Sequence, residues 1–528
     1  GKRNFRGGGR GGGGGGRGGG RGGGGGGGDK RQKTGTGWGD RKEWPDVVKE
    51  NAALEFYYKA QNIIPEGEWD AFLFACRATL PTTFRISPVG TFAGEVKDQL
   101  KTRFKELQLD EHTLDENDER LLPPQPIDWY PDNLAWYMSI SKKALKRTPA
   151  LEKFHKYLVA ETETGNLTRQ EAVSMIPPLF MDIEPHHKIL DMCAAPGSKT
   201  SQCLEYLHMK AGSNGVPEGI VMANDADLDR CGMLIHQMKR INSPSLVVLH
   251  HEAQKIPMLW SRAEEGGPPR KPLRYDRVLA DVPCSGDGTM RKNIDIWKKW
   301  NCSMGMGLHR TQIQILCRAV ELCEAGGIVV YSTCSMNPME NEAVVAYVLQ
   351  KFRHCLEIED VSQQLVALKR CPGLLTWKVQ DKKQDKLLFE NAAAVPDNLK
   401  AMYPLSMFPP ADAAELHLER CVRILPHHQD TGAFFITKIR KFADHNPPKV
   451  AGEEVVKGKD DAPPAEAPLA AAAAAPAVAA AAAGDVKMVE KVEEKGAEAK
   501  AEPAAAAAAE DGTRCCCCCC CCGASRPP

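Results

Sequence analysis

From residue 187 onwards, short apolar runs alternate with amphipathic segments. Five apolar runs have the length and residue types of buried strands, at residues 188–193, 219–224, 245–250, 277–281 and 327–332. Segments with helical spacing accompany them, at residues 199–209, 228–240, 310–323 and 340–352. Strands that alternate with helices call for right-handed crossovers, so the pattern predicts an α/β fold with a mostly parallel, doubly wound sheet.

Two later apolar runs, at residues 420–425 and 433–440, flank the polar stretch 427–432. This pattern predicts an antiparallel hairpin that closes one edge of the sheet. Between residues 357 and 407 the pattern assigns no elements.

Upstream of the sheet, residues 44–140 have a mixed pattern that predicts a smaller α/β region. Helices are expected at residues 47–61, 95–107 and 150–162, and a short strand at 84–86. The basic side chains of this region are either phosphate contacts or part of an ordinary solvated helix face, and both interpretations stay open. They belong to Arg85, Lys97, Lys101, Arg103 and Lys105.

Both ends of the 528-residue chain have compositions that cannot form a packed core. Residues 1–28 contain 20 glycines, six Lys or Arg and no acid, which favours contact with RNA phosphates and bases over a linker without a partner. Residues 449–528 are rich in Ala, Pro, Glu and Lys and include eight consecutive cysteines. We therefore expect a disordered arm at 1–43 and a disordered tail at 442–528.

Composition excludes several classes of protein. A net charge of zero excludes a globally basic nucleic-acid binder, but not a basic arm on a near-neutral body. Outside the terminal run, the cysteines lack both the spacing of a secreted disulfide module and any CxxC pair, so we expect a reduced intracellular protein without a metal. No apolar stretch reaches the ~18–20 residues of a membrane helix, and no membrane partner is expected.

The first chemical motif, DMCAAPGSKT at residues 191–200, follows the first strand and opens a helix. A phosphate-binding P-loop would need GxxxxGK[ST], but Met192 occupies the leading glycine position and Ser198 separates Gly197 from Lys199. The GxGxxG of a dinucleotide site is also absent. The remaining interpretation is a site for the methyl donor S-adenosylmethionine.

Asp225 ends the second predicted strand. An acid at that place can accept both ribose hydroxyls of a nucleoside, although a strand-end Asp is as often the N-cap of the next helix.

Two further motifs each begin where a predicted strand ends, and each contains a cysteine. They are DVPCSGDGT at 281–289, with Cys284, and YSTCSMNP at 331–338, with Cys334. Buried cysteines are usually inert packing residues. These two, however, sit at the carboxyl ends of strands, where open α/β sheets bind ligands, and neighbouring strands lie only ~5 Å apart. We expect both thiols to face one cleft.

Together these motifs resemble the Sun-domain family of RNA cytosine-5 methyltransferases, and within it the multisite tRNA-modifying branch. The resemblance covers roughly residues 44–441 and includes ANDAD at 223–227, DVPCSGDGTMRKN at 281–293 and STCSMNPMENEAVV at 332–345. It implies a Rossmann-like S-adenosylmethionine-dependent methyltransferase domain at 150–441 and a smaller N-terminal RNA-binding region at 44–149.

The resemblance also implies roles for individual residues. Asp225 would hold the ribose of S-adenosylmethionine, and Glu252, where the family usually has Asp, would contact its adenine. Asp281 would lie near both the donor and the target base and interact with the proton on ring nitrogen 3. Cys334 would be the nucleophile, and Cys284 would assist release of the methylated RNA. The methyl-donor pocket would be lined by Cys193, Ala194, Ala195, Pro196, Gly197, Ser198 and Lys199.

The chemistry explains why a thiol is needed. Carbon 5 of cytosine is a poor nucleophile until a thiolate has added to carbon 6. A cysteine of ordinary pKa, about 8.5, is only a few per cent thiolate at pH 7, so we expect Lys199 and the sulfonium to lower that pKa.

One alternative concerns the two cysteines. In DNA cytosine methyltransferases the attacking cysteine follows a proline, as Cys284 does here, whereas the second thiol at Cys334 favours RNA. The expected substrate is tRNA, with ribosomal RNA or a catalytically silent RNA-binding scaffold as alternatives. No obligate protein partner is inferred. We expect a nuclear location, with nucleolus and cytoplasm as alternatives.

Overall fold

The computed structural model describes residues 48–89, 92–106, 124–138, 149–211, 216–260, 271–384 and 386–445. The arm predicted at residues 1–43 lies outside these ranges, as do residues 446–528 of the predicted tail. Within the described ranges, no helix combines the length and the apolar character that crossing a bilayer requires.

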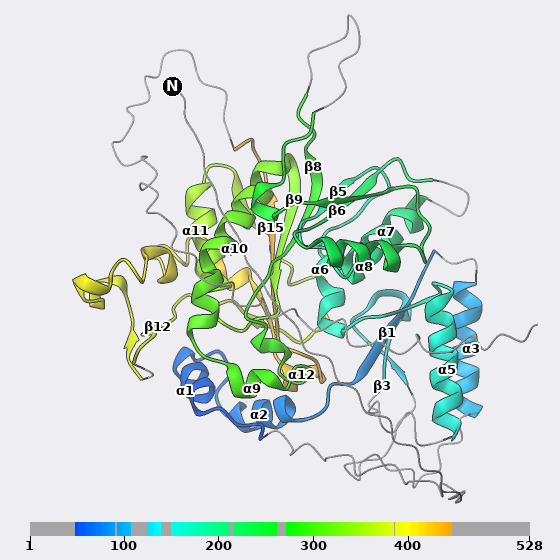
Figure 1. The fold of residues 1–528 in the computed structure, drawn as a ribbon, viewed down its shortest axis with the longest axis horizontal. Coiled ribbons are helices and arrows are strands. Elements are labelled where there is room, and N and C mark those ends of the chain that lie inside the picture. Colours follow the sequence, from blue (N-terminus) through cyan, green and yellow to red (C-terminus); the bar gives the residue numbers. More distant parts are fainter. Residues whose placement is uncertain are drawn as a thin grey trace, which may run out of the picture. The chain divides into compact units, whose positions relative to one another are not determined.

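The centre of the large sheet consists of five parallel strands in the order β9–β8–β5–β6–β7 (Figure 1). Their bounds are Lys188–Asp191 (β5), Ile220–Asp225 (β6), Leu246–His250 (β7), Tyr275–Asp281 (β8) and Cys323–Thr333 (β9). The order reverses between β5 and β8, as in doubly wound sheets whose ligands bind at the carboxyl ends of the strands. The predicted parallel sheet is confirmed.

Antiparallel strands extend the sheet beyond β9. The predicted hairpin is confirmed, because β15 pairs with both β9 and β14, in a register that places Val422 opposite Ile436. Two short strands lie outside it, β10 against β15 and β11 against β14. The bounds are Leu356–Ile358 (β10), Cys371–Pro372 (β11), Val422–Ile424 (β14) and Phe434–Lys441 (β15).

Helices cover both faces of this sheet (Figure 1). One core contains side chains of α10 and α11 with Leu190 and Val278, and a second contains side chains of α6, α7 and α8 with Ile189 and Leu279. Neighbouring strand residues thus enter opposite cores, as the alternation of side chains along a strand requires. The bounds are Ile176–Leu179 (α6), Ser198–Ala211 (α7), Leu228–Met238 (α8), Ser303–Leu322 (α10) and Glu342–Lys351 (α11).

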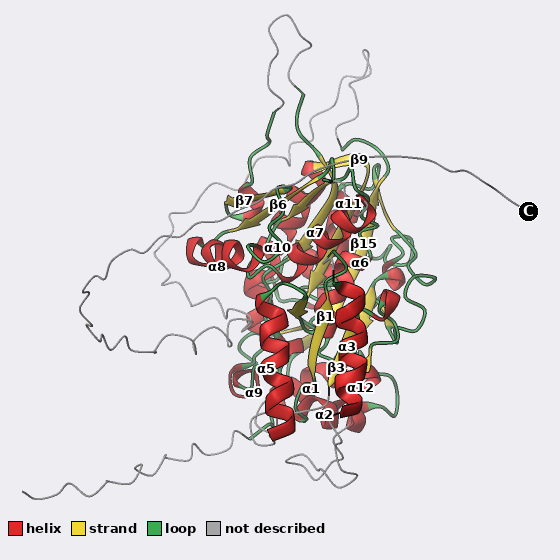
Figure 2. Cartoon of the chain, turned by 90° about the vertical axis from the view of Figure 1, so that its right-hand side faces the viewer, coloured by secondary structure: helices red, strands yellow, loops and turns green. Residues whose placement is uncertain are grey.

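A second sheet, of order β2–β3–β1–β4, has the adjacent helices α3 and α5 packed on it (Figure 2). Its core contains Phe84, Trp136 and Leu158. The strand β4 comes from the range predicted to be catalytic, so the two predicted domains share this sheet. The bounds are Thr82–Ile86 (β1), Ala93–Glu106 (α3), Gln125–Pro126 (β2), Ala135–Met138 (β3), Pro149–Glu163 (α5) and Leu167–Arg169 (β4).

The phosphate-contact interpretation is wrong for Arg85. Its side chain is fully buried and forms an ion pair with Glu205 of α7, and its Nε donates to Gln170 Oε1 at 2.7 Å. The guanidinium therefore links the small sheet to the large one, and no face of it is available to RNA.

Helices α1 and α2 share a third core with α9 and with the loop that follows β9. The helix predicted at 47–61 begins only at Ala52, because the Asn51 side chain accepts from Leu54 N at 2.9 Å and caps it. Residues 357–407 fold mainly into turns and very short elements, which explains why no period was visible there. The bounds are Ala52–Gln61 (α1), Trp69–Arg77 (α2), Asp295–Lys299 (α9), Val379–Gln380 (β12), Leu388–Phe389 (β13) and Pro426–Gln429 (α12).

Candidate active site at the carboxyl edge of the sheet

The two cysteine motifs meet because β8 and β9 are parallel neighbours. Asp281 lies opposite Ser332 at the ends of these strands, and the loops that follow bring Cys284 Sγ within 3.2 Å of Cys334 Sγ. Both cysteines are half-buried. The structure brings the two thiols together at this edge, as expected; the shared cleft and their separate roles stay predictions.

Asp281 lies beside the thiols with both carboxylate oxygens engaged. Oδ1 accepts from Ser332 Oγ at 2.7 Å, and Oδ2 lies 2.6 Å from Lys199 Nζ. Burial by itself would lower the pKa of Lys199, but the charge of Asp281 and its hydrogen bond raise that pKa above its ordinary value. Lys199 is therefore an ammonium group, held at the start of α7 and 5.5 Å from the Phe434 ring centroid.

The lowered pKa was expected of the attacking thiol, Cys334, and stays a prediction; the pKa of the second thiol, Cys284, moves in the other direction. Its pKa is raised well above the ordinary value, first by the hydrogen bond with Cys334 and then by burial and the charge of Cys334. Either sulfur can donate the hydrogen bond between them, and the raised pKa of Cys284 favours its protonated thiol.

The loop after β5 is tied to the ends of β6 and β7. Ala194 N donates to Asn224 O at 2.7 Å, and the Asn224 side chain donates to Met192 O at 2.9 Å and to His251 O at 2.8 Å. These bonds bring the first motif, the ANDAD motif and the loop after β7 to one edge.

Asp225 is 3% exposed at the end of β6, beside that loop. Its Oδ2 accepts from Ala195 N and its Oδ1 from Asp227 N, both at 3.1 Å. The N-cap alternative is excluded, because Asp227 caps α8 by accepting from Arg230 N at 3.0 Å. Each Asp225 oxygen accepts one backbone bond, which leaves lone pairs for a hydroxyl-bearing ligand.

Gly197 has a positive φ of 115° and lies close to α8. A Cβ at this position would lie 2.8 Å from Leu234 Cδ1 and 2.9 Å from Met238 Cε. The glycine is required mainly for its backbone conformation, because the ends of the Leu234 and Met238 side chains can shift. The Cys193 thiol nearby has a pKa raised by burial and by the charge of Asp191, so it is neutral.

Asp191 stands at the first position of the same motif, but the sequence alone suggested no role for it. It is 1% exposed, and Thr200 Oγ1 donates to its Oδ2 at 2.7 Å. Its Oδ1 is buried and has no hydrogen-bond partner among the described residues. Burial, the main cause, raises the pKa of Asp191 to about 7. An acceptor left open at this edge fits a donor group on a ligand.

Glu252 lies at the same edge as Asp225 but is much more exposed. Asp225 pairs with His250 across β6 and β7, and Glu252 follows two residues later. Its carboxylate is about half-exposed and lies 2.9 Å from Lys255 Nζ. The Glu252 carboxylate is thus accessible to solvent and already paired with a lysine.

A separate cluster joins α2 to α12. Glu68 Oε2 lies 2.7 Å from His427 Nε2 and 3.0 Å from His428 Nε2, a spacing that also fits a metal ion. The Nδ1 atoms of both rings are buried and have no partner among the described residues, whereas a metal-bound histidine normally donates its second ring N–H. The cluster is therefore interpreted as a hydrogen-bonded contact between two helices.

Comparison with known proteins finds methyltransferases of similar sequence. Residues 178–440 match the family described as 16S rRNA methyltransferase RsmB/F. The multisite-specific tRNA:(cytosine-C(5))-methyltransferase trm4b of Schizosaccharomyces pombe is 42% identical over 416 residues, which are 75% of this chain and 60% of that protein. The tRNA (cytosine(49)-C(5))-methyltransferase of Pyrococcus abyssi is 32% identical over 281 residues, 53% of this chain and 72% of that protein.

Among solved structures, NSun6 from Pyrococcus horikoshii is similar with a TM-score of 0.48 and 18% identity, over 76% of this chain and 100% of that one. This chain spans 60%, 57% and 56% of the length of three relatives that are each 42% identical to it. The match to the Pyrococcus abyssi enzyme covers most of that protein. The chain belongs to the RsmB/F, or Sun-domain, family of methyltransferases.

Proposed function

We propose that this protein transfers a methyl group from S-adenosylmethionine to carbon 5 of cytosine in RNA, with tRNA as the main substrate. The observation that carries the proposal is the pair of thiols 3.2 Å apart, next to the Lys199–Asp281 ion pair. Four relatives, at 32% to 42% identity, are named as tRNA cytosine-C5 methyltransferases, which supports tRNA over ribosomal RNA.

The residues at the edge of the sheet fit S-adenosylmethionine. The lone pairs of the Asp225 carboxylate suit the ribose hydroxyls, and the unpaired Asp191 Oδ1 suits a donor such as the amino group of the methionine part. Residues 193–199 would line the pocket, and Glu252 would contact the adenine. When bound, S-adenosylmethionine supplies an electrophilic methyl group on a positively charged sulfur.

The chain's own groups account for activation of the base. Cys334, as thiolate, forms a bond to carbon 6 of cytosine, and the displaced electron pair makes carbon 5 nucleophilic. Cys284, which stays protonated, donates a hydrogen bond that stabilises the Cys334 thiolate. Asp281, held by Lys199 and Ser332, interacts with the proton on ring nitrogen 3 and so stabilises the adduct.

The same pair accounts for release. After methyl transfer, a base takes the proton from carbon 5, the electron pair of that C–H bond re-forms the double bond between carbons 5 and 6, and the bond between carbon 6 and Cys334 breaks to return the Cys334 thiolate. Cys284 stands next to this sulfur and assists that step. A paired cytosine must first leave the stack, at a cost of a few kcal/mol, so bases near loops and junctions are the expected targets.

The remaining parts of the proposal concern the rest of the chain. Residues 44–149 would contribute RNA contacts, and the Arg/Gly arm would add sequence-independent ones. A nuclear site of action is also proposed, and its support is the family resemblance alone.

The test uses the full chain with unmodified tRNA, ribosomal RNA and S-adenosylmethionine. Cys334→Ala should form no denaturant-resistant RNA adduct and transfer no methyl groups, whereas Cys284→Ala should accumulate the adduct. Cys371→Ala, which changes a half-buried cysteine in β11, is the matched control and should behave as wild type.

Adduct formation by Cys334→Ala, with its loss in Cys284→Ala, would exchange the two roles. A wild-type protein that binds S-adenosylmethionine and RNA but methylates neither RNA would be a silent scaffold, and the proposal would fail. If the protein methylates ribosomal RNA but not tRNA, the proposed chemistry stands and the proposed substrate is wrong.

A further inference from the structure

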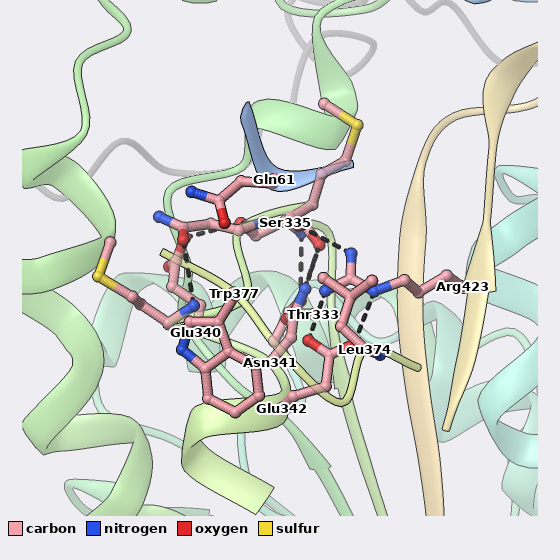
Figure 3. Close-up of polar contacts among 12 residues, drawn as sticks. Gln61, Thr333, Ser335, Glu340, Asn341, Glu342, Leu374, Trp377 and Arg423 are labelled. Atoms are coloured by element: carbon pink, nitrogen blue, oxygen red, sulfur yellow. Dashed lines mark hydrogen bonds and ion pairs between the residues drawn. The ribbon is translucent and has the colours of Figure 1, made fainter. Parts of the chain in front are cut away.

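The two cysteine loops are joined behind the thiols by a buried carboxylate. Glu340 is fully buried, and its oxygens accept from Ser285 N at 2.8 Å, Ser285 Oγ at 2.5 Å and Ser335 Oγ at 2.7 Å. Ser285 and Ser335 directly follow Cys284 and Cys334. One side chain therefore holds the residue next to each thiol, and Figure 3 shows it at the Ser335 turn.

A fourth donor completes the coordination of this carboxylate. Gln312 of α10 donates its Nε2 to Glu340 Oε1 at 3.0 Å and to Pro283 O at 2.9 Å. A carboxylate is an acceptor-only group, and four donors converge on its two oxygens. The preceding residue of the Cys284 loop, Pro283, is thereby fixed as well.

Asp287 forms the reciprocal contact. It follows Cys284 by three residues, is fully buried, and its Oδ1 accepts from Met336 N, in the Cys334 loop, at 2.8 Å. Its Oδ2 accepts from Trp300 Nε1 at 3.1 Å and from the Tyr58 hydroxyl of α1. Each cysteine loop thus carries a carboxylate that holds the other loop.

We infer that Glu340 and Asp287 are positioning residues that set the separation of the two thiols. No hydrogen bond joins either carboxylate to a cysteine sulfur among the described contacts, so they act through the loops. The inference rests on the proposed function only for the consequence that the thiols serve in catalysis. A misplacement of the reacting groups by about 1 Å can slow a reaction about 100-fold, so residues that hold the thiols in place affect the rate.

The cost of these groups argues against a role in packing alone. Two buried carboxylates lose their hydration, and apolar side chains of similar size would stabilise a core at least as well. The neighbouring turn is also fixed independently, because Asn341 Nδ2 donates to Ser335 O at 2.9 Å and Asn341 Oδ1 accepts from Thr333 Oγ1 at 2.6 Å (Figure 3). The two loops are also joined by a backbone bond from Gly288 N to Cys334 O at 3.0 Å, and Glu340 and Asp287 add side-chain links to it.

A glycine in α10 makes room for this arrangement and supplies a sharp test. A Cβ at Gly305 would lie 2.4 Å from Asn337 Nδ2 and 2.8 Å from Glu340 Oε2. Gly307, two residues further along the same helix, has nothing within 4 Å of that position. Gly305→Ala displaces Glu340, and Gly307→Ala is its matched control with the same gain in helix propensity.

The first measurement needs neither RNA nor S-adenosylmethionine. The oxidant diamide is added to the full chain, and formation of the Cys284–Cys334 disulfide is followed by peptide mass spectrometry. The two thiols lose two protons and two electrons, which reduce the diazene to its hydrazine. Glu340→Ala should slow this reaction by about tenfold to 100-fold, because the thiols no longer start in contact.

Glu340→Gln should stay within about threefold of wild type, because the amide oxygen can keep the two N–H donors and its NH₂ can donate to the two hydroxyls. Gly305→Ala should slow the reaction in the same direction as Glu340→Ala, and Gly307→Ala should not. The affinity for S-adenosylmethionine, measured by calorimetry, should stay the same, since its loop is held by other contacts. Asp287→Asn should also slow disulfide formation.

If Glu340→Ala fails to fold, the Gly305→Ala and Gly307→Ala pair decides. Wild-type rates in Gly305→Ala, or in a folded Glu340→Ala, would overturn the inference. If the wild-type protein does not methylate RNA but these variants still form the disulfide slowly, the proposed function is wrong and the positioning role stands.

Discussion

Cys284 Sγ lies 3.2 Å from Cys334 Sγ, although 50 residues separate them along the chain. Two sulfurs in contact do not ionise independently, because a second negative charge would sit against the first. One thiol is therefore kept protonated, and the upward direction of the Cys284 pKa agrees with that thiol being Cys284.

Removing Cys334 should make Cys284 more reactive. Cys334 raises the pKa of Cys284 through a hydrogen bond and through its charge, so a smaller fraction of the Cys284 side chain is thiolate at a given pH. In Cys334→Ala this pKa moves down, and alkylation of Cys284 by iodoacetamide at pH 8 should become faster, by about tenfold for each unit of pKa. Peptide mass spectrometry over pH 6 to 10 measures it. Cys193, whose pKa is raised mainly by burial, is the internal control. An unchanged or slower reaction of Cys284 would contradict the assignment.

Acid should destabilise the fold through His187. Burial and the charge of Arg277 lower the pKa of His187 to about 4, and its Nδ1 accepts from Glu184 N at 2.9 Å. The unfolded chain binds a proton at about pH 6.5 and the folded chain only near pH 4, so stability is lost as pH falls between these values, by roughly 3 kcal/mol.

Urea unfolding at pH 7 and pH 4.5 measures this loss. His187→Asn keeps an acceptor near Glu184 N and should lose about 2 kcal/mol less than wild type over this range. His186→Asn, at the exposed neighbouring position, should follow the wild-type curve. Identical pH dependence in wild type and His187→Asn would refute the prediction.

Removing one partner of the buried ion pair between Arg85 of β1 and Glu205 of α7 should destabilise the fold more than replacing both partners with apolar residues. Glu205→Ala leaves the Arg85 guanidinium buried and unpaired, which should reduce the free energy of unfolding by about 3–5 kcal/mol. The double variant Arg85→Met with Glu205→Leu should recover most of this loss. Lys299→Ala, in an exposed pair with Asp295, should change stability by no more than about 1 kcal/mol. A smaller loss in Glu205→Ala than in the double variant would show that the pair is not the link between the sheets.

Gly197→Ala should damage both stability and affinity for S-adenosylmethionine. The new Cβ meets two side chains of α8 and the residue has positive φ, so the free energy of unfolding should fall by about 1–3 kcal/mol. Gly232→Ala, within α8 and with open space around it, should be neutral or stabilising by about 1 kcal/mol. Thermal unfolding and calorimetric titration measure the two effects. Full affinity in Gly197→Ala would mean that this loop does not line the pocket.

The order of strands and helices in the large sheet was predictable. The apolar runs of β5 to β9 and the amphipathic period of α7, α8 and α11 are local patterns, and local patterns survive without knowledge of the fold. Helix α10 begins at Ser303, seven residues before its predicted start at residue 310, because its first two turns contain two glycines and carry little periodic signal. No elements were predicted within residues 357–407, because most of the helices and strands there span only two or three residues.

The candidate site was predictable as a set of motifs, but not as a geometry. The sequence placed Asp225, Asp281, Cys284 and Cys334 at strand ends, from which a common edge follows. Glu340 and Asp287 stood inside the quoted motifs with nothing to distinguish them from solvated acids. Asp191 likewise carried no signal beyond its place at the end of a strand.

The sequence by itself determined the order of the elements, the strand ends on which the chemistry sits and the family, because these depend on neighbours along the chain. Tertiary structure decided which distant side chains touch. The contacts of Cys284 with Cys334, Ser285 with Glu340 and Arg85 with Glu205 join residues 50, 55 and 120 positions apart. Such pairs form only once the strands have a spatial order. Burial then gives Arg85 its ion pair with Glu205, and it places Glu340 and Asp287 where they hold the two cysteine loops.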